Sequence, residues 1–210
     1  MGRYTGPLCK LCRREGMRLF LKGDKCVSQA CTLNKKSYPP GKVSKFAKKP
    51  TEYALQLREK QKVKRYYGVY ERQFRKFFAM ASKHKGVTGE MLLQYLERRL
   101  DNIVYRAGFV SSRRAARQLV SHGNVYVNGK RVTIPSFIVK AGDEIELAPK
   151  AKTFDFVVKS LEASVNRVIP GWLEVDSSNV KVKITSIPTR AEMNLDIEVN
   201  EQLIVELYSK

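Results

Sequence analysis

The chain of 210 residues is poor in two kinds of side chain that enzymes depend on. It has only two histidines, and it has 20 Asp and Glu residues against 40 Lys and Arg residues. Neither His84 nor His122 stands in a recognisable catalytic spacing, and the sequence has no phosphate-binding glycine loop, nucleophile elbow or zinc-hydrolase motif. We therefore expect a protein that is not an enzyme.

Long apolar segments are also missing. No apolar run reaches the roughly 20 residues that a membrane-spanning helix needs, and no signal-peptide core is visible. Met1-Gly2 is followed by Gly6 where a myristoylation signal would have Ser or Thr. We therefore expect no membrane attachment and a cytoplasmic location.

The excess of basic residues gives a formal net charge of +20, and it is localised. Residues 1–150 hold 33 Lys and Arg against 11 Asp and Glu, whereas residues 151–210 hold 7 against 9. Such an excess repels itself in a compact fold, so a polyanion is the natural partner. The near-neutral C-terminal segment is expected to pack back on the helical part or to cover the sheet, away from the polyanion.

All four cysteines lie near the start of the chain, in the pattern C-x2-C-x13-C-x4-C formed by Cys9, Cys12, Cys26 and Cys31. Four thiolates suit tetrahedral zinc, and such a short segment has little else to stabilise it. An iron-sulfur cluster is a less favoured alternative, and disulfides are another. A DNA-reading zinc finger is disfavoured because no histidine pair follows the cysteines.

Residues 35–50 are rich in Lys and Pro and are expected to form a basic arm that becomes ordered against nucleic acid or serves as a solvated linker. A helix is predicted from Thr51 to Arg65, with basic residues on its exposed positions. The adjacent Tyr66-Tyr67 pair could stack on unpaired bases or pack in the core. In the following helix, Phe74, Phe77, Phe78 and Ala81 have core spacing, while Arg72, Arg75 and Lys76 point outward.

The segment 93–132 predicts two amphipathic helices and a hairpin. Leu93, Leu96, Leu100, Ile103 and Ala107 have the spacing of one helix that ends at Gly108, and its arginines are expected to face solvent. Ser112 is placed to cap a second helix whose exposed side carries Arg113, Arg114 and Arg117. After a stop at Gly123, Asn128-Gly129 predicts a type I′ turn with Lys130 and Arg131 just past its tip.

Further strands are predicted by short alternating segments. Residues 138–139 and 144–147 are expected to complete a small sheet over the helices, and residues 172–175, 180–184 and 203–207 alternate in the same way. Trp172 is interpreted as a packing residue. The fold class is therefore α+β, with an antiparallel sheet packed on helices.

Taken together, these motifs resemble a known family. Residues 90–150 resemble the small RNA-binding domain named after ribosomal protein S-four, which also occurs in some RNA-modifying enzymes. The resemblance extends over essentially the whole chain and includes MGRYTG, LQLREKQKVKRYYG from Leu55, GVTGEMLLQYLERRLDNIVYR from Gly86, and VNEQLIVELYSK at the end. One departure is that Lys42-Val43-Ser44 stands where many relatives have Gln-His-Gly.

The chain is thus similar to the bacterial small-subunit ribosomal protein S-four family. This resemblance implies a structural protein of the 30S subunit that binds the 5′ domain of 16S ribosomal RNA early in assembly. It also implies proteins S-five and S-three as neighbours, and an effect on translational accuracy together with S-twelve. An RNA-modifying enzyme carrying the same module is the alternative, although no segment remains for a catalytic domain.

Four segments follow from this interpretation: a cysteine knuckle and basic arm at 1–45, a helical RNA-binding domain at 46–90, the S-four domain at 91–152 and the near-neutral segment at 153–210. The predicted zinc ligands are the four cysteines. The predicted RNA-binding residues are Arg58, Lys60, Lys62, Lys64, Arg65, Arg72, Arg98, Arg99, Arg106, Arg113, Arg114, Arg117, Gln118, Asn128, Lys130 and Arg131.

Overall fold

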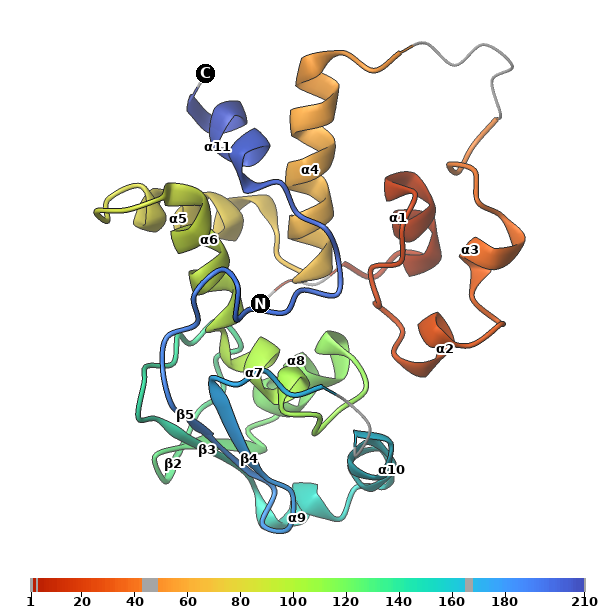
Figure 1. The fold of residues 1–210 in the computed structure, drawn as a ribbon. Helices are drawn as coiled ribbons and strands as arrows, with labels where there is room; N and C mark the ends of the chain where they lie inside the picture. The colour runs from red at the N-terminus through yellow and green to blue at the C-terminus, as the bar shows by residue number, and fades with distance from the viewer. Residues whose placement is uncertain (1, 3, 43–48, 165–167, 210) are drawn as a thin grey trace. The chain divides into compact units, whose positions relative to one another are not determined.

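The structure is a computed structural model that describes residues 2, 4–42, 49–164 and 168–209 (Figure 1). The chain divides into two compact units, Met1–Leu92 with Leu195–Lys210, and Leu93–Asn194. Part of the predicted basic arm, residues 43–48, lies outside the described residues, as do Val43 and Ser44 of the departure from the family pattern. The four-segment division stays a prediction.

The first unit is helical in the part that the structure describes. Its elements are α1 (Leu8–Glu15), α2 (Asp24–Val27), α3 (Thr32–Lys35), α4 (Glu52–Tyr66), α5 (Glu71–Ala81), the start of α6 (Thr88–Glu97) and α11 (Glu201–Ser209). Thr51, where the predicted helix begins, caps α4, because its hydroxyl accepts a hydrogen bond from the Ala54 amide at 3.3 Å.

The core of this unit joins α4, α5 and α11. Val63, Phe74 and Phe77 are buried, as is Ile204 of α11. Gln56 of α4 donates a hydrogen bond to Glu206 of α11 at 3.1 Å. The C-terminal helix therefore packs against α4, which lies far from it in the sequence.

The predicted strand at residues 203–207 is wrong, because these residues belong to helix α11. The alternation of Leu203, Val205 and Leu207 extends over too few residues to distinguish the two periods. In the structure Ile204 is fully buried and its neighbours are half-buried, which is the pattern of a helix lying on another helix. Packing against α4 decided the conformation.

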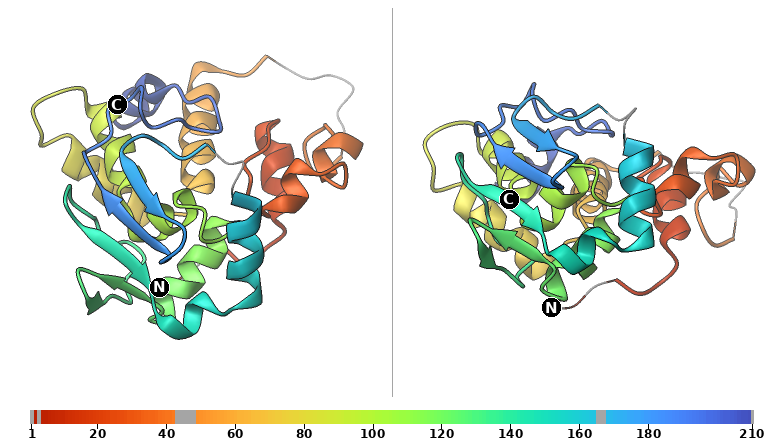
Figure 2. Two further views of the ribbon diagram at one scale, coloured as in Figure 1. Left: turned by 60° about the horizontal axis from the view of Figure 1, so that its bottom comes forward. Right: turned by 90° about the horizontal axis from the view of Figure 1, so that it is seen from below.

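The second unit contains a five-stranded antiparallel sheet with helices packed on it. Its elements are the end of α6, then α7 (Leu100–Arg106), α8 (Arg113–Ser121), β1 (Val125–Val127), β2 (Lys130–Arg131), β3 (Glu144–Leu147), α9 (Pro149–Lys152), α10 (Asp155–Ser164), β4 (Leu173–Asp176) and β5 (Lys181–Ile184). The strand order is β2-β1-β3-β5-β4. Figure 2 shows β5 and β4, in blue, continuing the sheet beside β3.

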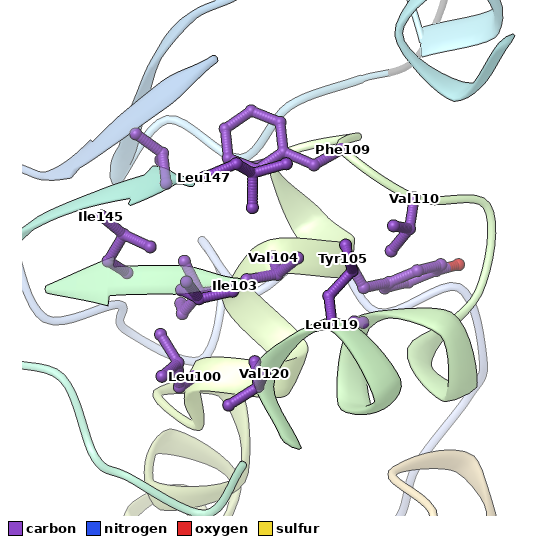
Figure 3. Packing of buried hydrophobic residues seen from close by; sticks show 14 of the residues in the cluster. Leu100, Ile103, Val104, Tyr105, Phe109, Val110, Leu119, Val120, Ile145 and Leu147 are labelled. Atoms are coloured by element: carbon purple, nitrogen blue, oxygen red, sulfur yellow. The ribbon is translucent and has the colours of Figure 1, made fainter. Parts of the chain in front are cut away.

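The core of the second unit lies between the sheet and helices α7 and α8. Figure 3 shows Ile103 and Val104 of α7, Leu119 of α8, and Ile145 and Leu147 of β3 converging on one apolar cluster. Each of these side chains is at most 2% exposed. Trp172 is 1% exposed and belongs to the same cluster, which confirms its predicted packing role.

The helix ends, the helix cap and the hairpin turn predicted for this unit are confirmed. Gly108 and Gly123 have φ values of 79° and 72°, the left-handed conformation that ends a helix. The Ser112 hydroxyl accepts a hydrogen bond from the Ala115 amide at 3.3 Å. Asn128 and Gly129 have φ values of 49° and 73°, as a type I′ turn requires.

Two sequence predictions are corrected here. The single helix expected over 93–107 is interrupted, because Arg99 is extended and forms an antiparallel bridge with Ile138. The strand predicted at residues 138–139 is wrong, because Ile138 is bridged to Arg99 outside the sheet. Instead its neighbour Phe137 accepts a hydrogen bond from the first amide of α7, Leu100 N, at 2.8 Å, which stabilises the interruption.

Candidate nucleic-acid interface

The exposed face of α8 and the β1–β2 hairpin form one cationic surface in the second unit. Gln118 and Lys130 are exposed and Arg114 is half-exposed, and within the described residues none of the three side chains has a hydrogen-bond or ion-pair partner. Arg114 and Gln118 lie one helical turn apart on α8. We call Arg114, Gln118, Lys130 and Arg131 the α8–hairpin surface.

Arg131 connects the two parts of this surface. Its Nε atom donates a hydrogen bond to the Gly123 carbonyl at 3.0 Å, and its Nη2 atom donates one to the His122 carbonyl at 3.3 Å. A Cβ atom added at Gly123 would overlap the Arg131 guanidinium group. Glycine is therefore needed at position 123 both for its positive φ and for the close approach of the guanidinium group.

Asn128 has a structural role in the hairpin. Its amide donates a hydrogen bond to Asp143 at 2.9 Å, and its side-chain oxygen accepts one from the Glu144 amide at 2.9 Å. Both polar atoms of the side chain are therefore engaged within the fold. The hairpin tip is attached to the start of β3 by these contacts.

Arg113 and Arg117, which were expected to face solvent, turn toward α7 instead. Arg113 is 8% exposed, donates a hydrogen bond from Nε to Asn102 at 2.8 Å and lies with its guanidinium carbon 4.3 Å from the Tyr105 ring centroid. The Arg117 side chain is 12% exposed and lies 3.7 Å from the Asp101 carboxylate. Arg113 and Arg117 therefore join the two helices.

Arg99 and Arg106 are also buried, and the expectation that they face solvent is wrong. Arg106 forms a two-pronged ion pair with Glu97 through Nε at 3.1 Å and Nη2 at 3.0 Å. Arg99 pairs in the same way with Asp101, with Nε at 2.9 Å. A buried charge requires such a partner, so these arginines stabilise the α6–α7 region.

Arg98 has an intermediate position. It is half-buried, and its Nε atom donates a hydrogen bond to the Val139 carbonyl at 2.8 Å. This bond holds the segment after Ile138 against the end of α6. Arg98 therefore has a structural contact, while part of its side chain remains accessible.

In the first unit, the basic residues of α4 are paired with carboxylates. Lys60 and Lys64 lie 3.0 and 3.1 Å from Glu71, and Lys62 lies 2.7 Å from Glu59. The remaining two basic side chains, Arg58 and Arg65, both contact Glu15 of α1. These residues were predicted to be exposed RNA contacts, but Lys60 and Lys62 are buried.

Two of these carboxylates show contrasting pKa shifts. Burial opposes ionisation of Glu71, but hydrogen bonds from Lys60, Lys64 and Tyr208 outweigh it and lower the pKa of Glu71 to about 2. For Glu15, burial has the larger effect and raises the pKa of the carboxyl group, although Arg65 and Arg58 act in the opposite direction. The basic side chains of α4 thus form ion pairs with carboxylates of the same unit.

Tyr66 and Tyr67 belong to the core and are not available for stacking on bases. Their side chains are 1% and 3% exposed, and their rings meet edge to face at 4.9 Å. The Tyr66 hydroxyl also lies 2.8 Å from Asp196. The core-packing alternative is therefore correct for both residues.

Helix α5 differs from α4 because its basic residues remain outside. Arg72 and Lys76 are exposed and have no ion-pair or hydrogen-bond partner within the described residues. Arg72 is one of the predicted RNA contacts, and Lys76, which is not, has the same outward spacing.

The four cysteines gather in the N-terminal segment, where three of the thiols are buried. Burial raises the pKa of Cys12 and of Cys26, while backbone amides of Leu19 and Lys22 donate to the two sulfur atoms and act in the opposite direction. Within the described residues, no group of three or more His, Cys, Asp or Glu side chains is arranged to hold a metal ion.

The fold and its cationic surface define an RNA-binding protein of the S4-domain class. Residues 98–145 match the family model described as the S4 domain, and residues 3–97 match the model described as the Ribosomal protein S4/S9 N-terminal domain. No described helix has the length and apolar character of a membrane span.

Curated relatives extend the match to the full chain. The chain is 54% identical over 210 residues to "Small ribosomal subunit protein uS4" of Thermoanaerobacter sp. strain X514, 55% over 212 residues to that of Dictyoglomus turgidum, and 51% over 211 residues to that of Thermus thermophilus. Each comparison covers the whole of both chains. The protein belongs to the uS4 family of small ribosomal subunit proteins.

This membership confirms three predictions: the family resemblance, the α+β fold class and the absence of enzymatic function, since the family is structural. It also identifies the kind of partner, namely ribosomal RNA and other proteins of the small subunit.

Proposed function

We propose that the protein is a structural component of the cytoplasmic small ribosomal subunit and binds 16S ribosomal RNA. The observation that carries this proposal is the match to uS4 proteins over the full length of the chain. The α8–hairpin surface supports it, because Arg114 and Lys130 are cationic side chains that the fold leaves without partners in its described part.

The mechanism is binding by charge and shape. Lys and Arg side chains displace counterions from phosphates, which favours association most strongly at low salt. Arg131 is anchored to the end of α8, so the hairpin presents its charge in a preorganised position. Folded RNA is recognised largely by shape and backbone contacts, which suits a rigid cationic surface better than a base-reading site.

The finer features follow from the family resemblance and remain part of the proposal. They are binding to the 5′ domain early in assembly, contact with proteins S-five and S-three, and a contribution to translational accuracy together with S-twelve. The anchored hairpin and the separate helical unit offer two places at which RNA segments could be held in one assembly step.

Co-sedimentation tests the main proposal. A tagged chain should enter small subunits reconstituted from 16S ribosomal RNA and the remaining small-subunit proteins, and the purified chain should bind refolded 16S RNA at stoichiometric amounts. A chain that binds duplex DNA more tightly than this RNA, or that stays at the top of the gradient, would contradict it.

We also propose that Cys9, Cys12, Cys26 and Cys31 hold zinc, with an iron-sulfur cluster as the less favoured alternative. The paired cysteine spacing supports this, as does the hydrogen bond of 3.3 Å from the Lys22 amide to the Cys26 sulfur. Zinc would stabilise the knuckle once the thiols have lost their protons, so its affinity should increase with pH.

Metal analysis of protein purified without oxygen tests this second proposal. We expect about one zinc per chain, lost in Cys9→Ser, together with faster amide exchange in residues 8–35 and unchanged exchange in α7 and α8. Iron and sulfide in place of zinc would support the alternative, and protein without either metal would exclude both.

A further inference from the structure

Helix α5 of the first unit carries basic residues that, apart from Arg75, make no ion pair or hydrogen bond within the described residues. Arg72, Arg75, Lys76 and Ala79 are exposed on α5, opposite the buried Phe74, Phe77 and Ala81. The helix ends in an exposed turn that carries Lys83 and Lys85. We call Arg72, Arg75, Lys76, Ala79, Lys83 and Lys85 the α5 surface.

The α5 surface is almost free of negative charge. Among the described residues, the only ion pair made by its cations is that of Arg75 with Glu71 at 3.4 Å, and Glu71 is held chiefly by Lys60, Lys64 and Tyr208. The Arg75 side chain is still 70% exposed, so this pair neutralises little of its charge. The other four cations have no hydrogen-bond or ion-pair partner in the described part of the chain.

Helix geometry aligns Arg72, Lys76 and Ala79 on one face of α5, and Lys83 and Lys85 follow in the turn after the helix ends. Arg72 and Lys76 lie one turn apart, about 6 Å along the axis, and Ala79 follows on the same face. Ala79 is exposed on this face, and its side chain is short and uncharged. Repulsion among such closely spaced like charges is unfavourable without an anionic ligand.

We propose that the α5 surface is the principal site at which the first unit binds the ribosomal RNA phosphate backbone. This inference rests on the proposed function and deepens it, because it places the RNA contact of this unit on α5 and its following turn. The α4 cations, which the sequence pattern favoured, act instead as structural partners of Glu15, Glu59 and Glu71.

Charge insertion at Ala79 gives a direct test. Ala79→Glu places a carboxylate on the α5 surface, at an exposed helical position where glutamate is well tolerated. Binding of the full-length protein to refolded 16S ribosomal RNA should weaken on the order of tenfold at low salt and recover relative to wild type at high salt. The matched control is Ala163→Glu, at an exposed position of the near-neutral α10, which should bind like wild type.

Charge removal gives a second measurement. The variant Arg72→Ala/Lys76→Ala/Lys83→Ala should reduce the slope of log affinity against log salt by roughly 2 to 3 units. Its circular dichroism and unfolding midpoint should match wild type, because these side chains have no partners in the described structure. Wild-type affinity and slope in both α5 variants would overturn the inference.

Three further outcomes separate this inference from the proposed function. If Arg114→Ala/Lys130→Ala weakens RNA binding while the α5 variants do not, the α5 proposal fails and the function stands. If the wild-type chain does not bind the RNA at all, the proposed function fails. Normal binding to naked RNA with reduced incorporation into small subunits would assign the α5 surface to a protein neighbour and also overturn the inference.

Discussion

Helices α4 and α5 are consecutive and both rich in Lys and Arg, yet the structure uses their charges in opposite ways. Lys60, Lys62 and Lys64 each lie within 3.1 Å of a carboxylate, whereas Arg72 and Lys76 have no such partner in the described residues. The density of basic residues along a helix therefore does not tell which of them can bind RNA. The positions of the carboxylates decide it.

The same contrast occurs within α8. Arg113 and Arg117 face Asn102 and Asp101 of α7, while Arg114 and Gln118 face outward. One short helix thus contributes one pair of residues to the fold and another to the candidate interface. Adjacent positions separate into these roles because they differ by about 100° around the helix.

The largest expected effect of a single substitution is at the buried partner of Arg106. Glu97→Ala should lower the free energy of unfolding by about 3–5 kcal/mol, because it leaves the Arg106 guanidinium buried without its carboxylate. Urea unfolding followed by circular dichroism measures this. A loss below about 1 kcal/mol would show that Arg106 reaches solvent and that the contrast between buried and exposed arginines is weaker than the structure indicates.

A smaller effect is expected from two neighbouring arginines, which test the division of α8. Arg113→Ala should cost about 2–3 kcal/mol of stability, because the hydrogen bond to Asn102 and the contact with the Tyr105 ring are lost. Arg114→Ala should change stability by less than about 0.5 kcal/mol but reduce the salt slope of RNA binding by up to roughly 0.9 units. If instead Arg113→Ala changed RNA binding and Arg114→Ala lowered stability, the roles assigned to these two residues would be reversed.

An effect smaller than those of Glu97→Ala and Arg113→Ala is the pH dependence that Glu71 gives to the α4–α5 contact. The pKa of Glu71 is about 2 in the folded protein, below its unfolded value near 4.5, so its ionised form stabilises the fold above pH 4.5. This stabilisation is lost as the pH falls from 4.5 toward 2. After allowance for solvent screening of the half-buried group, we expect about 1–2 kcal/mol.

The variant Glu71→Gln provides the control for this titration. It should be less stable than wild type at pH 6 and should approach wild type near pH 2.5, where most of the stabilisation from the wild-type carboxylate has been lost. Urea midpoints at several pH values give the comparison. A constant difference between the two proteins across this range would contradict the proposed role of the charge.

Much of the local structure could be predicted from the sequence. The Thr51 and Ser112 caps, the stops at Gly108 and Gly123 and the Asn128-Gly129 turn depend on contacts within a few residues of the chain, and all are present. The predicted apolar face of α5 is also confirmed for Phe74 and Phe77, which are buried. Local hydrogen bonding and backbone sterics are sufficient for these features.

The errors share a physical cause, which is contact between distant parts of the chain. The helix expected over 93–107 is interrupted because Arg99 pairs with Ile138, and the strand expected at 203–207 is a helix because it packs on α4. Arg106 was placed in solvent because its helical position looked polar, whereas Glu97 pairs with it inside the fold. No local pattern identifies such a partner.

The sequence by itself determined the family, the α+β class, the cationic character and the short-range turns and caps, because composition, motif spacing and local sterics are carried by neighbouring residues. The tertiary structure alone decided which cations are available to RNA. That choice depends on whether folding brings a carboxylate within ion-pair distance: it does for Arg106 and Lys60, and it does not for Arg114 and Lys76 in the described chain.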